Sequence, residues 1–131
     1  MAKYFFLLTF SMIILFSGCA HTPAPQQTDT ETEQSVVAAF KQGLKQLQEN
    51  NSQKAVFMFS QAAQQKPDWA RAHFNLGLAL AKERKYTQAV KSYNQAIALE
   101  PEMINAYNNR ALAYFALGKK EEALADWDHC I

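Results

Sequence analysis

Side chains that could do chemistry are densest near the end of the sequence, at Asp126, Asp128, His129 and Cys130. Carboxylate, imidazole and thiolate groups are zinc ligands, and a His–carboxylate pair can also transfer protons. Neighbouring residues of a helix point about 100° apart, so Asp128, His129 and Cys130 cannot converge on one ion. We therefore interpret the acidic residues and His129 as a solvated helix surface. Cys130 is interpreted as a small buried apolar residue, with pairing to another chain as the alternative.

No other group of residues indicates catalysis. His21 and His73 lie far apart in the sequence, and glycine-rich phosphate loops, serine elbows and paired catalytic carboxylates are missing from it. The sequence predicts a protein that is not an enzyme, binds no metal or other cofactor and has no small-molecule substrate. With 13 basic and 12 acidic residues the net charge is +1, which does not favour nucleic acid as a partner.

Residues 1–18 have the features of a secretory signal peptide. Lys3 supplies a positive charge, Tyr4–Phe16 is almost wholly apolar, and Ser17 and Gly18 are small. The apolar run is short for a membrane span. We therefore predict export from the cytoplasm.

Cys19 is the residue for which the sequence indicates a modification. The run Leu15–Cys19 resembles a bacterial lipobox, which implies that Cys19 is acylated, with palmitate among the chains, and becomes the mature N-terminus. Two or more acyl chains hold a protein firmly on a membrane. Ala20 in place of Asp resembles the pattern of lipoproteins sent to the outer membrane, facing the periplasm. An ordinary signal peptide cleaved near Ala20 is the alternative.

The polar segment that follows shows no apolar periodicity. Residues 19–35 are rich in Thr, Gln and Pro, and such a composition buries too little surface to offset its ordering entropy. We predict a disordered linker between the lipidated cysteine and a folded domain at 36–131.

Within 36–131 the residue types recur every 34 positions. A period of this size is typical of stacked helical repeats. Each recurring position keeps one physical type, being tiny, tiny, aromatic, tiny or proline: Gly43, Gly77 and Ala111; Ala55, Ala89 and Ala123; Phe59, Tyr93 and Trp127; Ala62, Ala96 and Cys130; Pro67 and Pro101. Tiny residues allow close helix packing, aromatic residues fill the space between helices, and proline ends a helix.

The period divides the domain into repeats 36–69, 70–103 and an incomplete 104–131. Each repeat is predicted to hold two helices, over 36–49 and 53–66, 70–83 and 87–99, and 104–117 and from 121 on. Thr87 is a suitable N-cap, and Gly118 suits a helix end with positive φ. Glu121 and Glu122 suit the positive end of a helix dipole.

These residues resemble the tetratricopeptide repeat. The second repeat carries the resemblance best, and the third adds to it: Ala72, Asn75-Leu76-Gly77, Ala79, Tyr86, Ala89, Tyr93, Ala96 and Pro101; Tyr107, Ala111, Tyr114, Gly118, Ala123 and Trp127. The first repeat departs from the pattern, with Gln42 and Gln46 at usually apolar positions. The resemblance implies an all-α fold, a right-handed α-solenoid of helix-turn-helix hairpins.

The resemblance also implies a binding groove on the concave side, formed by the first helix of each repeat. The groove positions are Val37, Phe40, Leu44 and Leu47 in the first repeat, Arg71, Phe74, Asn75, Leu78, Ala81 and Lys82 in the second, and Asn105, Asn108, Leu112 and Phe115 in the third. Most are apolar, so we expect a protein partner that inserts an apolar helix or extended segment. A carboxylate-clamping mode known in the family is disfavoured, because Asn75 alone of five positions matches it. Packing of the same residues within the array is the alternative.

The combined features predict a membrane-anchored scaffold or adaptor that binds other proteins in the bacterial envelope. Lipidated proteins of this family include secretin pilots of type IV pilus systems and adaptors of cell-wall enzymes. The chain stops within its third repeat, so we expect a fragment of a longer protein that self-associates or is poorly soluble by itself. An open end covered by a partner or by a second copy is the alternative. A regulatory N-terminal part of a longer protein, with its active domain beyond residue 131, is a second hypothesis, and an inert spacer is a third.

Overall fold

The computed structural model describes residues 29–131, and this part of the chain consists of α-helices joined by short turns. The helices are α1 (Asp29–Gln48), α2 (Ser52–Gln65), α3 (Ala70–Lys82), α4 (Tyr86–Leu99), α5 (Ile104–Ala116) and α6 (Lys120–His129). The predicted signal peptide (1–18) and Cys19 lie outside the described residues. None of the described helices is both long and apolar enough to cross a bilayer.

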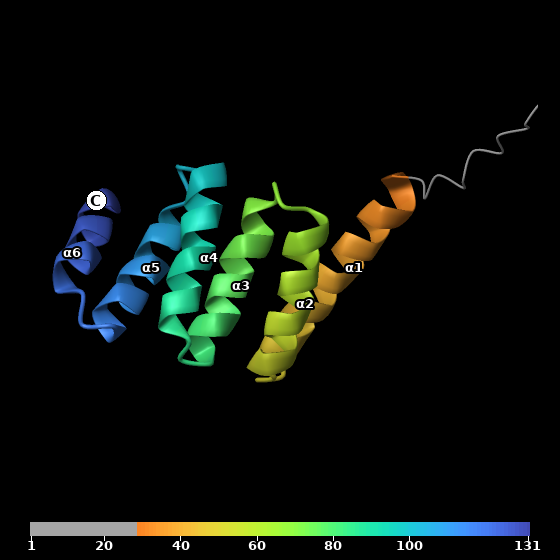
Figure 1. Ribbon diagram of the computed structural model, residues 1–131, viewed down its shortest axis with the longest axis horizontal. Helices are drawn as coiled ribbons and strands as arrows, with labels where there is room; N and C mark the ends of the chain where they lie inside the picture. The colour runs from red at the N-terminus through yellow and green to blue at the C-terminus, as the bar shows by residue number, and fades with distance from the viewer. Residues whose placement is uncertain (1–28) are drawn as a thin grey trace, which may run out of the picture.

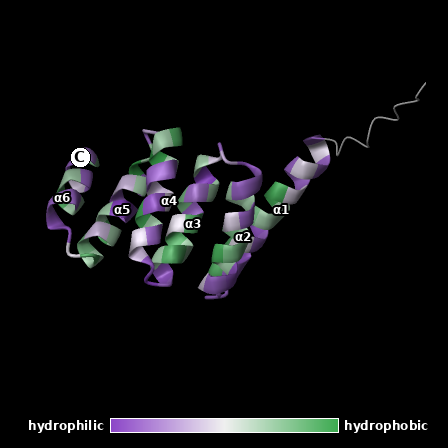
Figure 2. Cartoon of the chain, in the orientation of Figure 1, coloured by the Kyte–Doolittle hydropathy of each residue, from purple (hydrophilic) through white to green (hydrophobic). Residues whose placement is uncertain are grey.

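Each helix packs against the helices that precede and follow it in the sequence, and contact between non-neighbours is slight. The six helices therefore form a row with α1 at one end and α6 at the other (Figure 1). Hydrophilic and hydrophobic residues are interleaved along the helices, as expected for elements packed on some sides and solvated on others (Figure 2). The predicted all-α solenoid is confirmed.

The tiny and aromatic positions meet inside each hairpin. A Cβ atom added to Gly77 would lie 2.5 Å from Cε1 of Tyr93, and one added to Gly43 would lie 2.7 Å from Cε1 of Phe59. Phe59 and Tyr93 are the two largest fully buried side chains. Glycine is thus required at 43 and 77 because the ring of the second helix lies directly on the backbone of the first.

The turn inside each hairpin has the same backbone geometry. Asn50, Arg84 and Gly118 are 34 residues apart, and all three have positive φ, of 58°, 58° and 76°. The backbone N–H of the residue that follows donates a hydrogen bond to the carbonyl five residues before it. Lys85 N–H, for example, donates to the Leu80 carbonyl at 2.9 Å, and this is the hydrogen bond of a Schellman motif. The positive φ predicted for Gly118 is confirmed, and it holds for a whole column.

Two sequence-based predictions are wrong at helix starts. The linker was predicted to be disordered through residue 35, but 29–35 belong to α1. An existing helix extends more easily than a new one nucleates, and Asp29 and Glu31 sit favourably at its positive end. Thr87 is not the N-cap of α4, because the helix begins at Tyr86 and Thr87 is its second residue. Lys85 holds the N-cap position and makes no side-chain capping bond.

Candidate functional site: the wall formed by α1, α3 and α5

The first helices of the three hairpins border two adjoining hollows, which together we call the inner groove. The first hollow, of about 400 Å³, lies between α1, α3 and the start of α5. It brings together six of the predicted groove residues: Phe40, Leu44, Arg71, Phe74, Asn75 and Asn105. Glu100 and Met103, from the α4–α5 connection, complete it.

The second hollow, of about 360 Å³, lies between α3 and α5 and reaches α4. It brings together the predicted residues Leu78, Ala81, Lys82 and Leu112. Leu112 is 53% exposed, which leaves much of a large apolar side chain open to a ligand. Tyr86 and Tyr93 of α4 form part of its lining.

Helix α3 supplies the central stripe of the inner groove. Arg71, Asn75, Leu78 and Lys82 recur at spacings of three or four residues, so they share one face of the helix. The cations at its ends are about 16 Å apart along the axis, from a rise of about 1.5 Å per residue. In residues 29–131 neither cation joins a salt bridge. The stripe therefore offers an amide and an apolar side chain between two free positive charges.

Two asparagines hold matching positions on neighbouring helices of the groove. Asn75 Nδ2 donates to the Arg71 carbonyl at 2.8 Å, and Asn109 Nδ2 donates to the Asn105 carbonyl at 2.7 Å. Both bonds span four residues along one helix, and each fixes its amide against the helix backbone. Each amide keeps a second N–H and its carbonyl oxygen for a ligand.

Some predicted groove residues lie elsewhere or mainly pack. Phe40 is 6% exposed and contacts Phe59 and Trp69 in the core, and Leu47 is half-buried against the same core. Asn108 accepts a hydrogen bond from Trp127 Nε1 at 3.2 Å. Phe115 is 57% exposed, near the ring of Trp127, at the α6 end of the row.

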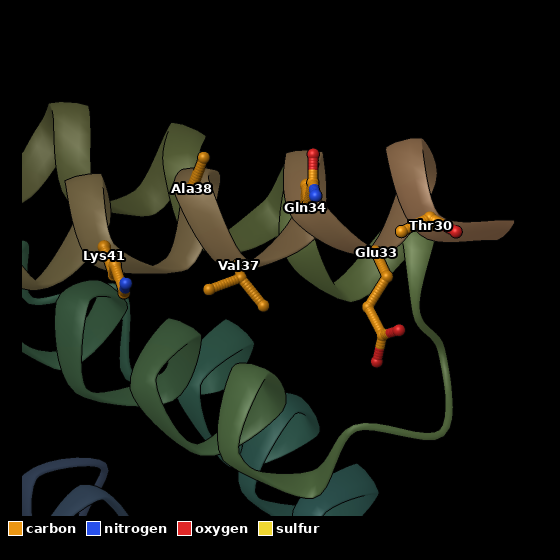
Figure 3. A pocket seen from close by; sticks show the side chains of 6 residues that line it. All are labelled: Thr30, Glu33, Gln34, Val37, Ala38 and Lys41. Carbon is orange, nitrogen blue, oxygen red and sulfur yellow. The ribbon is translucent and has the colours of Figure 1, made fainter. Parts of the chain in front are cut away.

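Val37 opens on a different hollow, of about 480 Å³, whose lining comes from α1 alone. In Figure 3, Val37 and Glu33 lie on one side of the helix face that lines this hollow, and Gln34 and Ala38 lie on the other side of the same face. The residues of this hollow, from Thr30 to Lys41, lie on and next to the part of α1 that was predicted to be linker. Sequence reasoning missed it because that segment has no apolar period.

The inner groove also contains residues outside the predicted groove set, among them Tyr86, Glu100, Met103 and Asn109. The signal for Asn109 was present, because it stands 34 residues after Asn75. Glu100 and Met103 are in an irregular connection, whose path the repeat pattern does not define.

The interpretation of the polar residues near the end of the chain as a solvated surface is wrong for Asp126, whereas Asp128 and His129 are exposed. The carboxylate is buried and accepts two hydrogen bonds from Arg110, Nε–Oδ2 at 2.7 Å and Nη2–Oδ1 at 2.6 Å. Arg110 Nη1 also donates to Asn94 Oδ1 at 2.6 Å. The hydrogen bonds to Asp126 raise the pKa of Arg110 above its ordinary value. The sequence contains a signal for this ion pair, because both residues depart from the repeat pattern. Arg110 and Asp126 stand where the second hairpin has Leu76 and Ser92.

The neighbours of Asp126 also have structural partners. The His129 ring lies 3.9 Å from that of Tyr107, and the half-buried Cys130 thiol donates to the Asp126 carbonyl at 3.3 Å. Across residues 29–131, no three His, Cys, Asp or Glu side chains are grouped as a metal site requires.

Comparison with known families agrees with this geometry. A profile described as tetratricopeptide repeat matches residues 40–98, and one described as TPR repeat matches residues 84–118. The helical part of this chain is a tetratricopeptide repeat domain. No curated protein sequence matches the chain.

Solved tetratricopeptide structures superpose on the domain. The first such domain of Spaghetti (RPAP3), bound to the HSP90 peptide SRMEEVD, is 26% identical with a TM-score of 0.72, covering 74% of this chain and 77% of that one. The TPR2B domain of yeast Sti1, in a complex with pHsp70, has the same identity and TM-score, covering 74% of this chain and 78% of that one. MamA (AMB-1) is 26% identical with a TM-score of 0.70, over 77% of this chain and 55% of its own.

Proposed function

We propose that this protein is a non-catalytic adaptor that is anchored to a membrane of the bacterial envelope and captures another protein in its inner groove. The observation that carries the proposal is the pair of adjoining hollows along α1, α3 and α5, in which large apolar side chains remain exposed. Leu44 is 37% exposed and Leu112 is 53% exposed. A folded domain that leaves such side chains open along one wall has a surface suited to a partner.

The ligand we propose is an apolar helix or an extended segment. The free cations Arg71 and Lys82 flank Leu78 on α3, so acidic residues on either side of an apolar anchor would strengthen binding. Two similar domains, from RPAP3 and yeast Sti1, form complexes with an HSP90 peptide and with pHsp70, which supports peptide capture as the role of the groove.

The location rests on the N-terminal sequence. Lipidation at Cys19 would place the domain near a membrane surface, and Ala20 favours the periplasmic face of the outer membrane. In that position the protein could assist assembly of an outer-membrane or pilus complex.

The groove is tested by affinity capture with the full chain from detergent-solubilised membranes. We expect Leu112→Glu to abolish capture, because a charge placed in the second hollow cannot be desolvated by an apolar ligand. The matched control is Leu99→Glu, which changes a 39% exposed leucine at the end of α4 and outside the groove. Circular dichroism checks that both variants keep their helicity. Equal capture by both variants would exclude the groove as the binding site.

A further inference from the structure

Tyr93 carries a hydroxyl group that the packing of the domain does not require. Its side chain is 1% exposed, and its ring lies on Gly77 as the ring of Phe59 lies on Gly43 in the first hairpin. No side-chain hydrogen bond within residues 29–131 involves Tyr93. A phenylalanine would fill the same space, so the hydroxyl group has no structural role within the described residues.

The Tyr93 hydroxyl group is not sealed in the core. Among the described residues, Gln46 Oε1 is the one side-chain oxygen or nitrogen that is both fully enclosed and unpaired. The Tyr93 hydroxyl group is unpaired but not fully enclosed, and the space that Tyr93 lines is the second hollow of the inner groove. Burial raises the pKa of Tyr93 above its ordinary value, so the group keeps its proton and can donate a hydrogen bond into the hollow.

The second hollow combines apolar walls with a free cation. Helices α3 and α4 bound it on one side and α5 on the other, so it lies between two hairpins. Lys82 forms no salt bridge within residues 29–131, and Asn109 has one side-chain N–H left for a ligand. The apolar walls are leucine and alanine side chains: Leu78, Ala81, Leu112, Ala113 and Ala116.

We propose that the second hollow binds the side chain of a glutamate in the captured segment, whose carboxylate accepts hydrogen bonds from Tyr93 and Lys82. The two methylene groups of the glutamate would lie against the leucine and alanine walls. This inference rests on the proposed function, because it names one residue of the segment that the inner groove takes. A carboxylate suits the hollow better than an amide, since Lys82 is positive and a charged acceptor forms the stronger hydrogen bond.

A purely apolar side chain fits the second hollow less well. It would shut the Tyr93 hydroxyl group away from water and leave a buried donor without an acceptor, which costs about tenfold or more in affinity. It would also bring no partner for the charge of Lys82. An aspartate has one methylene group fewer and would cover less of the apolar wall.

The preference for glutamate is tested by NMR titration of the full chain in detergent micelles. The probe is N-acetyl-glutamate N-methylamide, whose only charge is its side-chain carboxylate, and the control compound is the glutamine analogue. We expect saturable shifts at Ala81, Asn109 and Ala113, with a dissociation constant in the millimolar range for so small a ligand. The glutamine analogue should bind about fivefold or more weakly, because it lacks the charge. N-acetyl-leucine, whose carboxylate is a chain terminus, should also bind more weakly than the probe.

Two variants assign the groups that hold the carboxylate. Tyr93→Phe should weaken binding of the glutamate probe about tenfold, because it removes one hydrogen bond to a charged acceptor. Its melting temperature should not fall, since the hydroxyl group has no partner within the described residues. Lys82→Met should reduce binding of the glutamate probe to that of the glutamine analogue. Tyr107→Phe is the matched control: it removes a hydroxyl group from α5 outside the hollow and should change neither binding constant.

Affinity capture of the partner separates this inference from the proposed function. Tyr93→Phe should retain at least about threefold less partner than Tyr107→Phe. Loss of capture in Leu112→Glu with full capture in Tyr93→Phe would leave the proposed function standing and overturn the inference. A glutamate probe that does not bind, equal binding of the glutamine analogue, tighter binding of N-acetyl-leucine, or a lower melting temperature of Tyr93→Phe would also overturn it.

Discussion

At the scale of single residues, a backbone requirement repeats more strictly than residue identity does. Asn50, Arg84 and Gly118 hold the same left-handed turn, although a β-carbon is disfavoured there and asparagine is tolerated better than arginine. Gly118 could be assigned from sequence because glycine itself signals positive φ. The positive φ of Arg84 could not be assigned from sequence, because arginine does not favour this conformation. It is recognised only from the structure, where Arg84 shares its backbone conformation with Asn50 and Gly118.

The strained turn gives a prediction about stability. Arg84→Gly should raise the free energy of unfolding by about 0.5–1 kcal/mol, because relief of the left-handed penalty of about 1–2 kcal/mol exceeds the entropy that glycine adds to the unfolded chain. Urea denaturation measures this as a higher midpoint with an unchanged slope. Lys85→Gly is the control: its φ is −85°, so it should bring no gain. A lower midpoint for Arg84→Gly would show that the arginine side chain, not its backbone, matters at this turn.

At the scale of helices, the sequence predicted the pairing of helices and which positions are tiny or aromatic, because these repeat with a fixed period. The structure adds that the rings of Phe59 and Tyr93 lie against Gly43 and Gly77. It did not predict where α1 begins. Residues 29–35 are exposed and polar, so burial leaves no pattern in them, and their helicity depends on continuity with the packed part of α1. The Arg110–Asp126 pair was missed for a related reason: it joins α5 to α6 through residues that break the repeat.

That pair gives a prediction about how α6 is held. Arg110→Leu should cost about 3–5 kcal/mol, because it leaves the buried Asp126 carboxylate without its partner. Arg110→Leu combined with Asp126→Ser reproduces the Leu76 and Ser92 of the second hairpin, and it should recover most of the loss. Hydrogen exchange should show the single variant opening mainly at α6. Equal destabilisation by the single and double variants would mean that the arginine stabilises the fold through Tyr107 and Tyr114, whose rings lie 5.4 and 5.8 Å from its guanidinium carbon.

At the scale of the whole molecule, two regions serve separate purposes in our proposals. The inner groove takes a partner protein, and the N-terminal segment leads to the membrane. The hollows of the groove are lined by residues from Phe40 onward, whereas the proposed anchor is at Cys19, so the protein could bind a partner and a membrane at the same time.

The anchor gives a prediction about the intact protein in a bacterial host. Mass spectrometry of the wild-type protein should find a chain that begins at Cys19 and carries acyl groups, and fractionation should place it with the outer membrane. Cys19→Ser should abolish both acylation and this fractionation, because the remaining polar segment that begins at Ala20 contains no apolar run able to hold a bilayer. Cys130→Ser is the matched control: the thiol it removes contacts the backbone of α6, so acylation and location should be unchanged. An unmodified wild-type chain that begins near Ala20 would remove the anchor from the proposed function, while the groove would still be tested by its own variants.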